Sequence, residues 1–123
     1  MIQPKTLVKI CDNSGGKVGR VFKVLGSTGK RYAETGELVT LSVQTAEPRK
    51  DVQKNDVVKG IVVRQRKPLS REDGTYVRFD DNAVVVVDPE TGEVPATRVF
   101  GPIPREIKNS GFSQIASLAN EVV

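Results

Sequence analysis

The 123-residue chain contains no histidine, no tryptophan and a single cysteine, Cys11. Without histidine it lacks the commonest general base and the commonest metal ligand, and Cys11 has no histidine that could activate it as a nucleophile. One cysteine cannot form an internal disulfide, and no cysteine–histidine cluster exists for zinc, so the composition suits a reducing compartment. The sequence predicts a protein that is not an enzyme and that holds no cofactor or metal.

Long apolar runs are absent as well. No stretch approaches the about 18 apolar residues of a membrane-spanning helix, and residues 1–15 lack the apolar segment of a signal peptide. We therefore expect no membrane partner and no targeting segment. A chain of this length suits one domain, 1–123, and can bury about two-thirds of its unfolded surface without covalent staples.

Two short motifs suggest chemistry but fail on spacing or context. The stretch "GSTGK" (26–30) does not form a complete phosphate-binding loop, because only two residues separate its glycines and Arg31 follows where that motif needs Ser or Thr. Asp80 and Asp81 form an acidic pair, but Asp-Asp-Asn after a strand is common turn chemistry. Neither motif supports nucleotide binding or catalysis.

Short β-rich runs with turns between them are the dominant pattern, as in a sandwich or barrel. The expected strands lie within 6–12, 18–26, 37–46, 57–65, 75–79 and 83–88. The run 57–65 is apolar at most positions, so we expect burial on both faces for part of its length. From 104 to 119 the spacing becomes helical with an interruption at Ser110-Gly111, which predicts two short helices, the first opened by Pro104. The chain is expected to be all-β dominated: a small β-barrel with a helical C-terminal region.

The net charge of +4 hides an asymmetry between the two halves. Residues 1–67 carry 14 basic and 6 acidic side chains, a balance of +8, whereas residues 68–123 carry 5 and 9, a balance of −4. Opposite signs suggest a polyanion as the neighbour of the first half and protein as the neighbour of the second. An uneven solvated surface is the alternative.

Eleven basic residues lie in the expected hairpin loops or beside them. Loops at one end of a small barrel lie close together, so these charges can form one field that neutralises phosphates with little sequence dependence. We expect the tip of the hairpin 60–87 to enter a phosphate-lined cleft. The candidate RNA contacts are Lys17, Arg20, Lys30, Arg31, Arg49, Lys50, Lys54, Arg64, Arg66, Lys67 and Arg71.

The few aromatic residues indicate what kind of RNA is bound. Phe22, Phe79 and Phe100 lie in apolar strand contexts, which predicts core positions, whereas Tyr32 and Tyr76 flank basic turns and could stack on bases. We therefore expect folded RNA to be gripped by its backbone and shape. Two other classes stay open: a free-standing single-strand binder of the OB type, and a protein-interaction adaptor whose basic charge serves solubility.

A long pattern resembles the signature of the fourteenth protein of the large ribosomal subunit, in its bacterial and organellar form. It consists of Gly60, Ile61, Val62 and Val63, nine residues, Asp73-Gly74, four residues, Phe79, two residues, Asn82, two residues, and Val85-Val86. The stretches "MIQ", "DNSG" (12–15), "KVLG" (23–26), "RYA" (31–33), "TRVFGPIPREI" (97–107) and "SLANEVV" (117–123) are similar to that family too. The resemblance covers essentially the whole chain.

The resemblance implies a five-stranded β-barrel with a projecting β-ribbon, at about 1–100, followed by a region with two short helices, at about 101–123. It implies direct binding to large-subunit rRNA, bridges to small-subunit rRNA, and contact with large-subunit ribosomal proteins nineteen and three and with a ribosome-silencing factor. The protein contacts would fall on the acidic half, at Thr97, Arg98, Arg105 and Phe112.

The chain departs from the family pattern at Asn55, Pro104 and Asn120, and "KVGR" (17–20) is less basic than in many relatives. Asn55 replaces a common Gly, Asn120 replaces a common Pro, and Pro104 is unusual before "REI", so these positions affect loop detail, the start of the first helix and the path of the tail. The departures favour an organellar ribosome, mitochondrial before plastid, with the bacterial cytoplasm as the alternative location.

Overall fold

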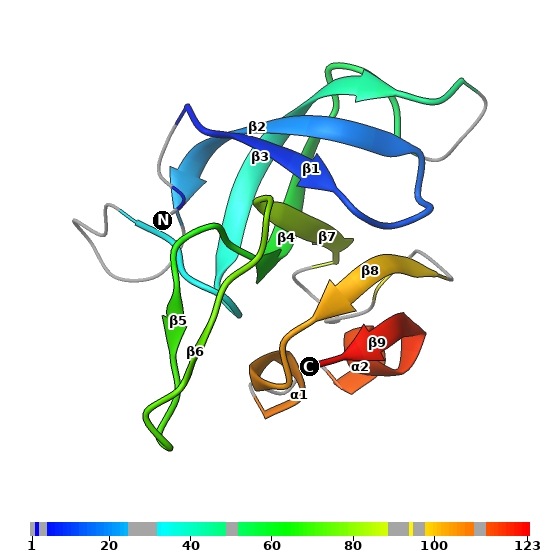
Figure 1. Cartoon of the computed structure of the whole chain (residues 1–123). Coiled ribbons are helices and arrows are strands. Elements are labelled where there is room, and N and C mark those ends of the chain that lie inside the picture. The colour runs from blue at the N-terminus through cyan, green and yellow to red at the C-terminus, as the bar shows by residue number, and fades with distance from the viewer. Residues whose placement is uncertain are drawn as a thin grey trace.

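Five strands close into a barrel in the order β1-β2-β3-β4-β7 (Figure 1). The structure is a computed structural model that describes residues 2, 5–24, 32–48, 52–88, 94, 98–109 and 113–123. Neighbouring barrel strands are antiparallel, except that β1 and β7 run parallel where the barrel closes. The strands are β1 (Leu7–Ile10), β2 (Gly16–Val24), β3 (Leu38–Ala46), β4 (Val57–Arg64) and β7 (Ala83–Val87). The prediction of an all-β-dominated chain with a five-stranded barrel is confirmed.

The other elements lie outside the barrel. An antiparallel pair, β5 and β6, follows β4 in the chain and extends away from the barrel before the chain returns to β7 (Figure 1). A parallel pair, β8 and β9, lies beside the two helical segments (Figure 1). Their bounds are β5 (Leu69–Ser70), β6 (Tyr76–Val77), β8 (Val99–Ile103), α1 (Glu106–Asn109), α2 (Ser113–Leu118) and β9 (Ala119–Val122). The expected helical run to residue 119 therefore ends one residue early, because Ala119 already pairs with Val99 as part of β9.

Strand β7 and the second half of β4 are buried on both faces. This agrees with the prediction that the run 57–65 is buried on both faces for part of its length. Val62 and Val84 point into the barrel among the interior core residues. Ile61, Val63 and Val85 point outward and are also fully buried, because the C-terminal region packs on them. That outer layer consists of Val94, Val99, Ile103, Ile107 and Ile115 with partly buried neighbours. The uninterrupted apolar run thus reflects one barrel wall covered from both sides.

The "DNSG" turn connects β1 to β7 and to β8, where Asp12 forms an isolated antiparallel bridge with Val99. The carboxylate of Asp12 accepts hydrogen bonds from the backbone N–H and the hydroxyl of Ser14, at 3.1 and 2.5 Å, and from the N–H of Val86, at 2.9 Å. Cys11 beside it is buried; its thiol donates to the carbonyl of Val84 at 3.5 Å, and burial raises its pKa to about 12. This cysteine is a core residue rather than a reactive thiol.

Two of the three phenylalanines expected in the core are not there. Phe79 is buried, as predicted, but 49% of Phe22 and 44% of Phe100 is exposed. The prediction was wrong for these two because alternation in a strand does not reveal which face a neighbouring element covers. Within the described ranges, no helix is long and apolar enough to cross a membrane.

Candidate nucleic-acid interface

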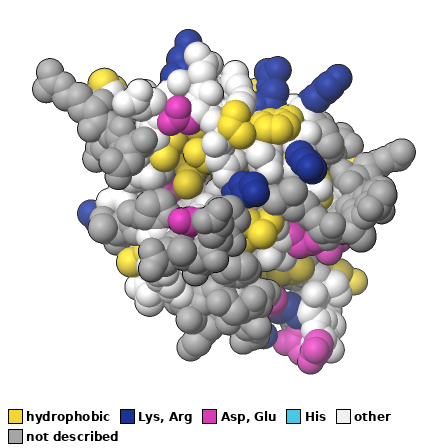
Figure 2. Space-filling view, turned by 180° about the vertical axis from the view of Figure 1, so that it is seen from behind, with side chains coloured by type: hydrophobic (Ala, Val, Ile, Leu, Met, Phe, Trp, Pro, Cys, Tyr) yellow, Lys and Arg dark blue, Asp and Glu magenta, His cyan; other side chains and the backbone are white. Residues whose placement is uncertain are grey.

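The barrel strands carry positive charge only. The five strands contain six Lys and Arg residues and no Asp or Glu. One of the six, Arg64, is buried, whereas the other five lie on the outer surface: Lys9, Lys17, Arg20, Lys23 and, half-exposed, Lys59. Figure 2 shows Lys and Arg side chains gathered over the upper part of one face, with hydrophobic side chains between them. Strands that carry cations and no carboxylates suit a polyanion.

Strand β2 presents its outer side chains in an irregular register. Its pairing with β3 shifts on either side of Val18 and again between Val21 and Lys23. Such shifts place two consecutive residues on one face. Lys17 and Val18 are therefore both accessible, as are Phe22 and Lys23, with Arg20 exposed between the two pairs.

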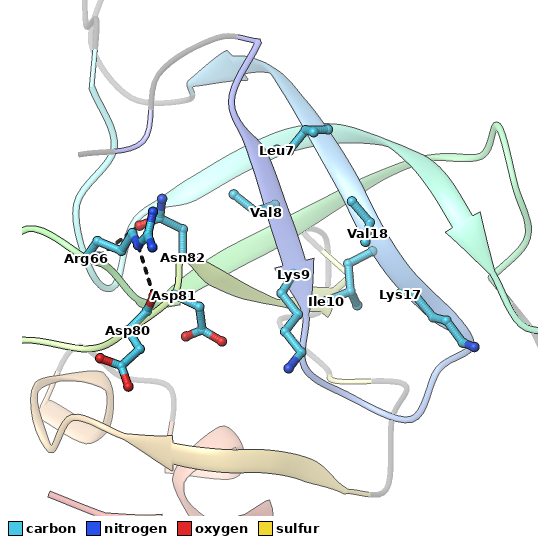
Figure 3. Close-up of a pocket in the computed structure, with 10 residues that line it drawn as sticks. All are labelled: Leu7, Val8, Lys9, Ile10, Lys17, Val18, Arg66, Asp80, Asp81 and Asn82. Atoms are coloured by element: carbon cyan, nitrogen blue, oxygen red, sulfur yellow. Dashed lines mark hydrogen bonds between the residues drawn. The ribbon is translucent and has the colours of Figure 1, made fainter.

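A groove of about 560 Å³ opens beside these strands (Figure 3). Leu7 and Lys9 of β1 and Lys17 and Val18 of β2 line one side, and Arg66 with the turn 80–82 lines the other. Arg66 is held in place, because its N–H donates to Asn82 Oδ1 and its Nε to the carbonyl of Asp80, each at 2.9 Å. Three cations and the two acidic residues Asp80 and Asp81 thus border a partly apolar floor.

Several of the predicted RNA contacts lie where a ligand could reach them. Lys17, Arg20, Lys54, Arg66 and Lys67 are all exposed. Lys17 and Arg20 lie on β2, Lys54 lies in the turn before β4, and Arg66 and Lys67 follow β4. Four others fall outside the described residues: Lys30, Arg31, Arg49 and Lys50.

Arg64 occupies an internal position instead. Only 5% of the residue is exposed. Its Nε and Nη2 contact the two oxygens of Asp81 at 2.9 and 3.3 Å, and its Nη1 donates to the carbonyls of Phe100 and Pro102 at 2.8 and 3.2 Å. Arg64 therefore connects the barrel to β8, and its prediction as a phosphate contact was wrong because its guanidinium is buried and fully engaged.

Arg71 likewise points to the C-terminal region. It holds Glu106 in a two-point contact at 2.7 and 3.2 Å and donates to the carbonyl of Val123 at 2.6 Å. Partial burial raises the pKa of Glu106, but the hydrogen bonds from Arg71 and from the backbone, with the charges of Arg71 and Arg105, outweigh it and hold the pKa below its usual value. Arg71 is therefore committed to an internal ion pair.

The tip of the β5–β6 hairpin is not basic, contrary to our expectation. With Arg71 turned toward α1, the exposed charges of the turn are Glu72 and Asp73. Hydrogen bonds from the hydroxyl and the N–H of Thr75, at 2.6 and 3.0 Å, hold the pKa of Asp73 below its usual value. The accessible cations Arg66 and Lys67 lie at the base of the hairpin, so the base rather than the tip is suited to phosphate.

The residues expected to contact proteins are partly described. Arg98 is exposed, with its guanidinium 5.6 Å from the centre of the Phe100 ring, and Arg105 is exposed just before α1. Thr97 and Phe112 lie outside the described residues. Arg98 and Arg105 both belong to the C-terminal region and are absent from the cationic face of the barrel.

Three accessible cations of the barrel strands are absent from the contacts predicted from the sequence: Lys9, Lys23 and Lys59. They lie within strands, whereas the prediction rested on basic residues in the hairpin loops or beside them. Strand alternation could have identified Lys9, since Val8 and Ile10 on either side point inward. Lys23 and Lys59 flank Thr40 across the β2–β3–β4 surface, and the outward position of Lys23 depends on a register shift.

The comparison with known families agrees with this architecture. A family model described as ribosomal protein L14p/L23e matches residues 1–123, which is the whole chain. The match extends over the barrel, the hairpin and the C-terminal region alike. The chain therefore belongs to the ribosomal protein L14p/L23e family, whose members are structural, non-enzymatic proteins of the large ribosomal subunit.

Proposed function

We propose that this protein binds large-subunit rRNA directly, through the outer surface of β1–β4 and the turns that adjoin it. The observation that carries this proposal is the absence of any carboxylate from barrel strands that hold five outward cations. The contacts proposed among the described residues are Lys9, Lys17, Arg20, Lys23, Lys54, Lys59, Arg66 and Lys67. Lys30, Arg31, Arg49 and Lys50 stay candidates from the sequence.

The physical basis is the neutralisation of phosphates. Each Lys or Arg that contacts a phosphate displaces condensed counterions, so the logarithm of affinity falls with the logarithm of salt concentration by about 0.7–0.9 per contact. A rigid barrel holds these cations at fixed spacings, which favours folded rRNA of matching shape. The protein would stabilise rRNA structure and perform no chemistry.

Binding to a large-subunit rRNA fragment, measured over a range of salt concentrations, tests this proposal. The variant Lys17→Ala/Arg20→Ala/Lys23→Ala should bind more weakly, and its salt slope should flatten by about 2–3 units if each residue contacts one phosphate. All three side chains are exposed, so the fold should persist.

The matched control is Arg78→Ala/Arg98→Ala/Arg105→Ala, which removes the same number of exposed charges away from β1–β4. It should leave affinity and slope close to wild type. Equal losses in the two variants would mean that net charge, and not this surface, controls RNA binding, and would refute the assignment.

We further propose the finer features of the family for this chain. The β5–β6 hairpin corresponds to the ribbon, and α1 and α2 to the two C-terminal helices. The protein would lie beside large-subunit proteins nineteen and three, contact small-subunit rRNA in intersubunit bridges, and offer a ribosome-silencing factor the surface that carries Thr97, Arg98, Arg105 and Phe112. The organellar matrix, mitochondrial before plastid, is the favoured location.

Sedimentation of ribosomes that carry the variants separates these roles. Substitution of Arg98 and Arg105 should leave the protein in the large subunit through high salt, because the rRNA face is intact. The same substitution should alter subunit joining or binding of the silencing factor. Release of this variant from the large subunit would contradict the division into an rRNA face and a protein face.

A further inference from the structure

The cationic face contains apolar side chains that phosphate binding does not explain. On β1 and β2, 53% of Leu7 and 49% of Phe22 is exposed, and Val18 is partly exposed. A barrel strand that only contacted phosphates would gain nothing from a half-exposed phenyl ring. Each of these apolar residues has a cation next to it in the chain or across the strand pair.

The register shifts of β2 produce this arrangement. Strict alternation after Val21 would turn Lys23 inward, but the shift between Val21 and Lys23 leaves Phe22 and Lys23 adjacent on the outer surface. The shift around Val18 does the same for Lys17 and Val18. Both irregularities therefore place one apolar side chain beside one lysine.

The β1 strand completes the surface. Leu7 pairs with Arg20, and Lys9 pairs with Val18, so each cross-strand pair again joins an apolar side chain to a cation. Phe22 lies diagonally from Leu7 across the strand pair, within reach of a large side chain. We name this surface the mixed strip: Leu7, Lys9, Lys17, Val18, Arg20, Phe22 and Lys23.

We propose that the mixed strip binds an unpaired segment of rRNA, with Phe22 and Leu7 against base faces and Lys17, Arg20 and Lys23 on the flanking phosphates. This inference rests on the proposed rRNA binding and specifies which form of RNA this surface accepts. An aromatic ring between cations on a sheet surface is the arrangement by which single strands are bound. A duplex would bury its base faces and offer Phe22 nothing to stack on.

Charge and shape favour RNA over a protein partner here. The strip holds four cations and no carboxylate. The groove of about 560 Å³ begins at its Leu7, Lys9, Lys17 and Val18 end (Figure 3). A base turned out of a strand could be accommodated there beside Arg66 and Asn82, while the acidic side chains of the groove, Asp80 and Asp81, lie on the side away from the strip. A protein partner would have to bring acidic and apolar residues in the same alternation.

Fluorescence anisotropy with the full-length protein and two labelled probes tests the inference: a short oligouridylate and an RNA duplex of matched length. Phe22→Ala should weaken binding to oligouridylate about 5- to 30-fold, in the range of one lost stacking contact. Its salt slope should not change, because no charge is removed. Lys23→Ala should flatten the slope by about 0.7. Binding to the duplex should be unaffected by Phe22→Ala.

Phe22→Tyr should restore binding, since it retains an aromatic face, and Phe100→Ala is the matched control because it removes a half-exposed phenylalanine from β8. Equal affinity of wild type and Phe22→Ala for oligouridylate would overturn the inference while leaving duplex or rRNA binding intact. Failure of wild type to bind any of the RNAs would overturn the proposed function itself. Poor ribosome incorporation of Phe22→Ala with normal RNA affinity would assign the strip to a protein partner.

Discussion

The contact between Gly101 and Arg64 leads to a quantitative prediction. Gly101 has a φ of +83°, and a Cβ added there would overlap Nη1 of Arg64. A flexible arginine normally moves aside at little cost, but this one is 5% exposed and bound to Asp81, Phe100 and Pro102. Gly101→Ala must therefore strain the backbone and break buried hydrogen bonds together.

The two costs can be separated. A left-handed backbone costs an alanine about 1–2 kcal/mol, and each hydrogen bond lost by a charged group costs about 1.5–3 kcal/mol. Loss of one such bond brings the cost of Gly101→Ala to about 2.5–5 kcal/mol. In an Arg64→Met background the overlapping guanidinium is gone, so Gly101→Ala should cost only the backbone term. The two substitutions should therefore be non-additive by about 2 kcal/mol, the double variant being more stable than the sum predicts.

Urea and thermal unfolding of the four proteins, followed by far-ultraviolet circular dichroism, measures this coupling. A difference of about 2 kcal/mol corresponds to roughly 6–12 °C in Tm for a chain of this length. Gly74→Ala is the control, because Gly74 has a φ of +86° and, among the described residues, no atom within 4 Å of an added Cβ. It should cost only the backbone term and should be additive with Arg64→Met. Additivity of Gly101→Ala within about 0.5 kcal/mol would refute the reasoning.

Three further predictions concern single groups. The pKa of Glu106 is depressed in the folded state, so the stability it contributes with Arg71 is complete above the unfolded pKa of about 4.3 and declines as pH falls through the folded value; an acid titration of stability should show this loss in wild type and not in Glu106→Gln. Cys11, with a pKa of about 12, should react with a thiol reagent at pH 8 only after unfolding. Asp12→Ala leaves the buried N–H of Val86 without its acceptor, and equilibrium unfolding should register a loss of about 2–3 kcal/mol.

The residues that define the family pattern could be read from the sequence because each has a local structural role. Gly60 lies where an added Cβ would come within 3.1 Å of the carbonyl of Val85, and Gly74 has a φ that favours glycine. Asp73 closes the hairpin turn through Thr75. Asn82 accepts the N–H of Arg66. Each role involves neighbours close in the sequence or on the partner strand. The residues that fill these roles therefore recur at fixed spacings, which is why the family pattern can be recognised in the sequence.

Other features depend on which surface the distant C-terminal region covers. Arg64 ends a strand much as a solvated arginine would, and its burial is decided by carbonyls 36 and 38 residues away in the chain. Phe22 and Phe100 have apolar neighbours in sequence, but each stays nearly half exposed in the fold. No residue pattern in the sequence marks the register shifts in β2. The outward position of Lys23, which depends on one of these shifts, could therefore not be predicted.

The distribution of burial around the barrel gives this small domain two different outer surfaces. The outer face of β4 and β7 is apolar and covered by the C-terminal region, whereas the outer face of β1 and β2 is cationic and exposed. Arg64, which donates to the carbonyls of Phe100 and Pro102, fixes the C-terminal region to the barrel, and the ion pair Arg71–Glu106 fixes it to the hairpin. Both guanidinium groups are engaged inside the protein, so neither is available to a phosphate. Two of the arginines that the sequence offered as RNA contacts, Arg64 and Arg71, thus hold the C-terminal region in place, and the cations proposed for RNA are those on the strands and in the adjoining turns.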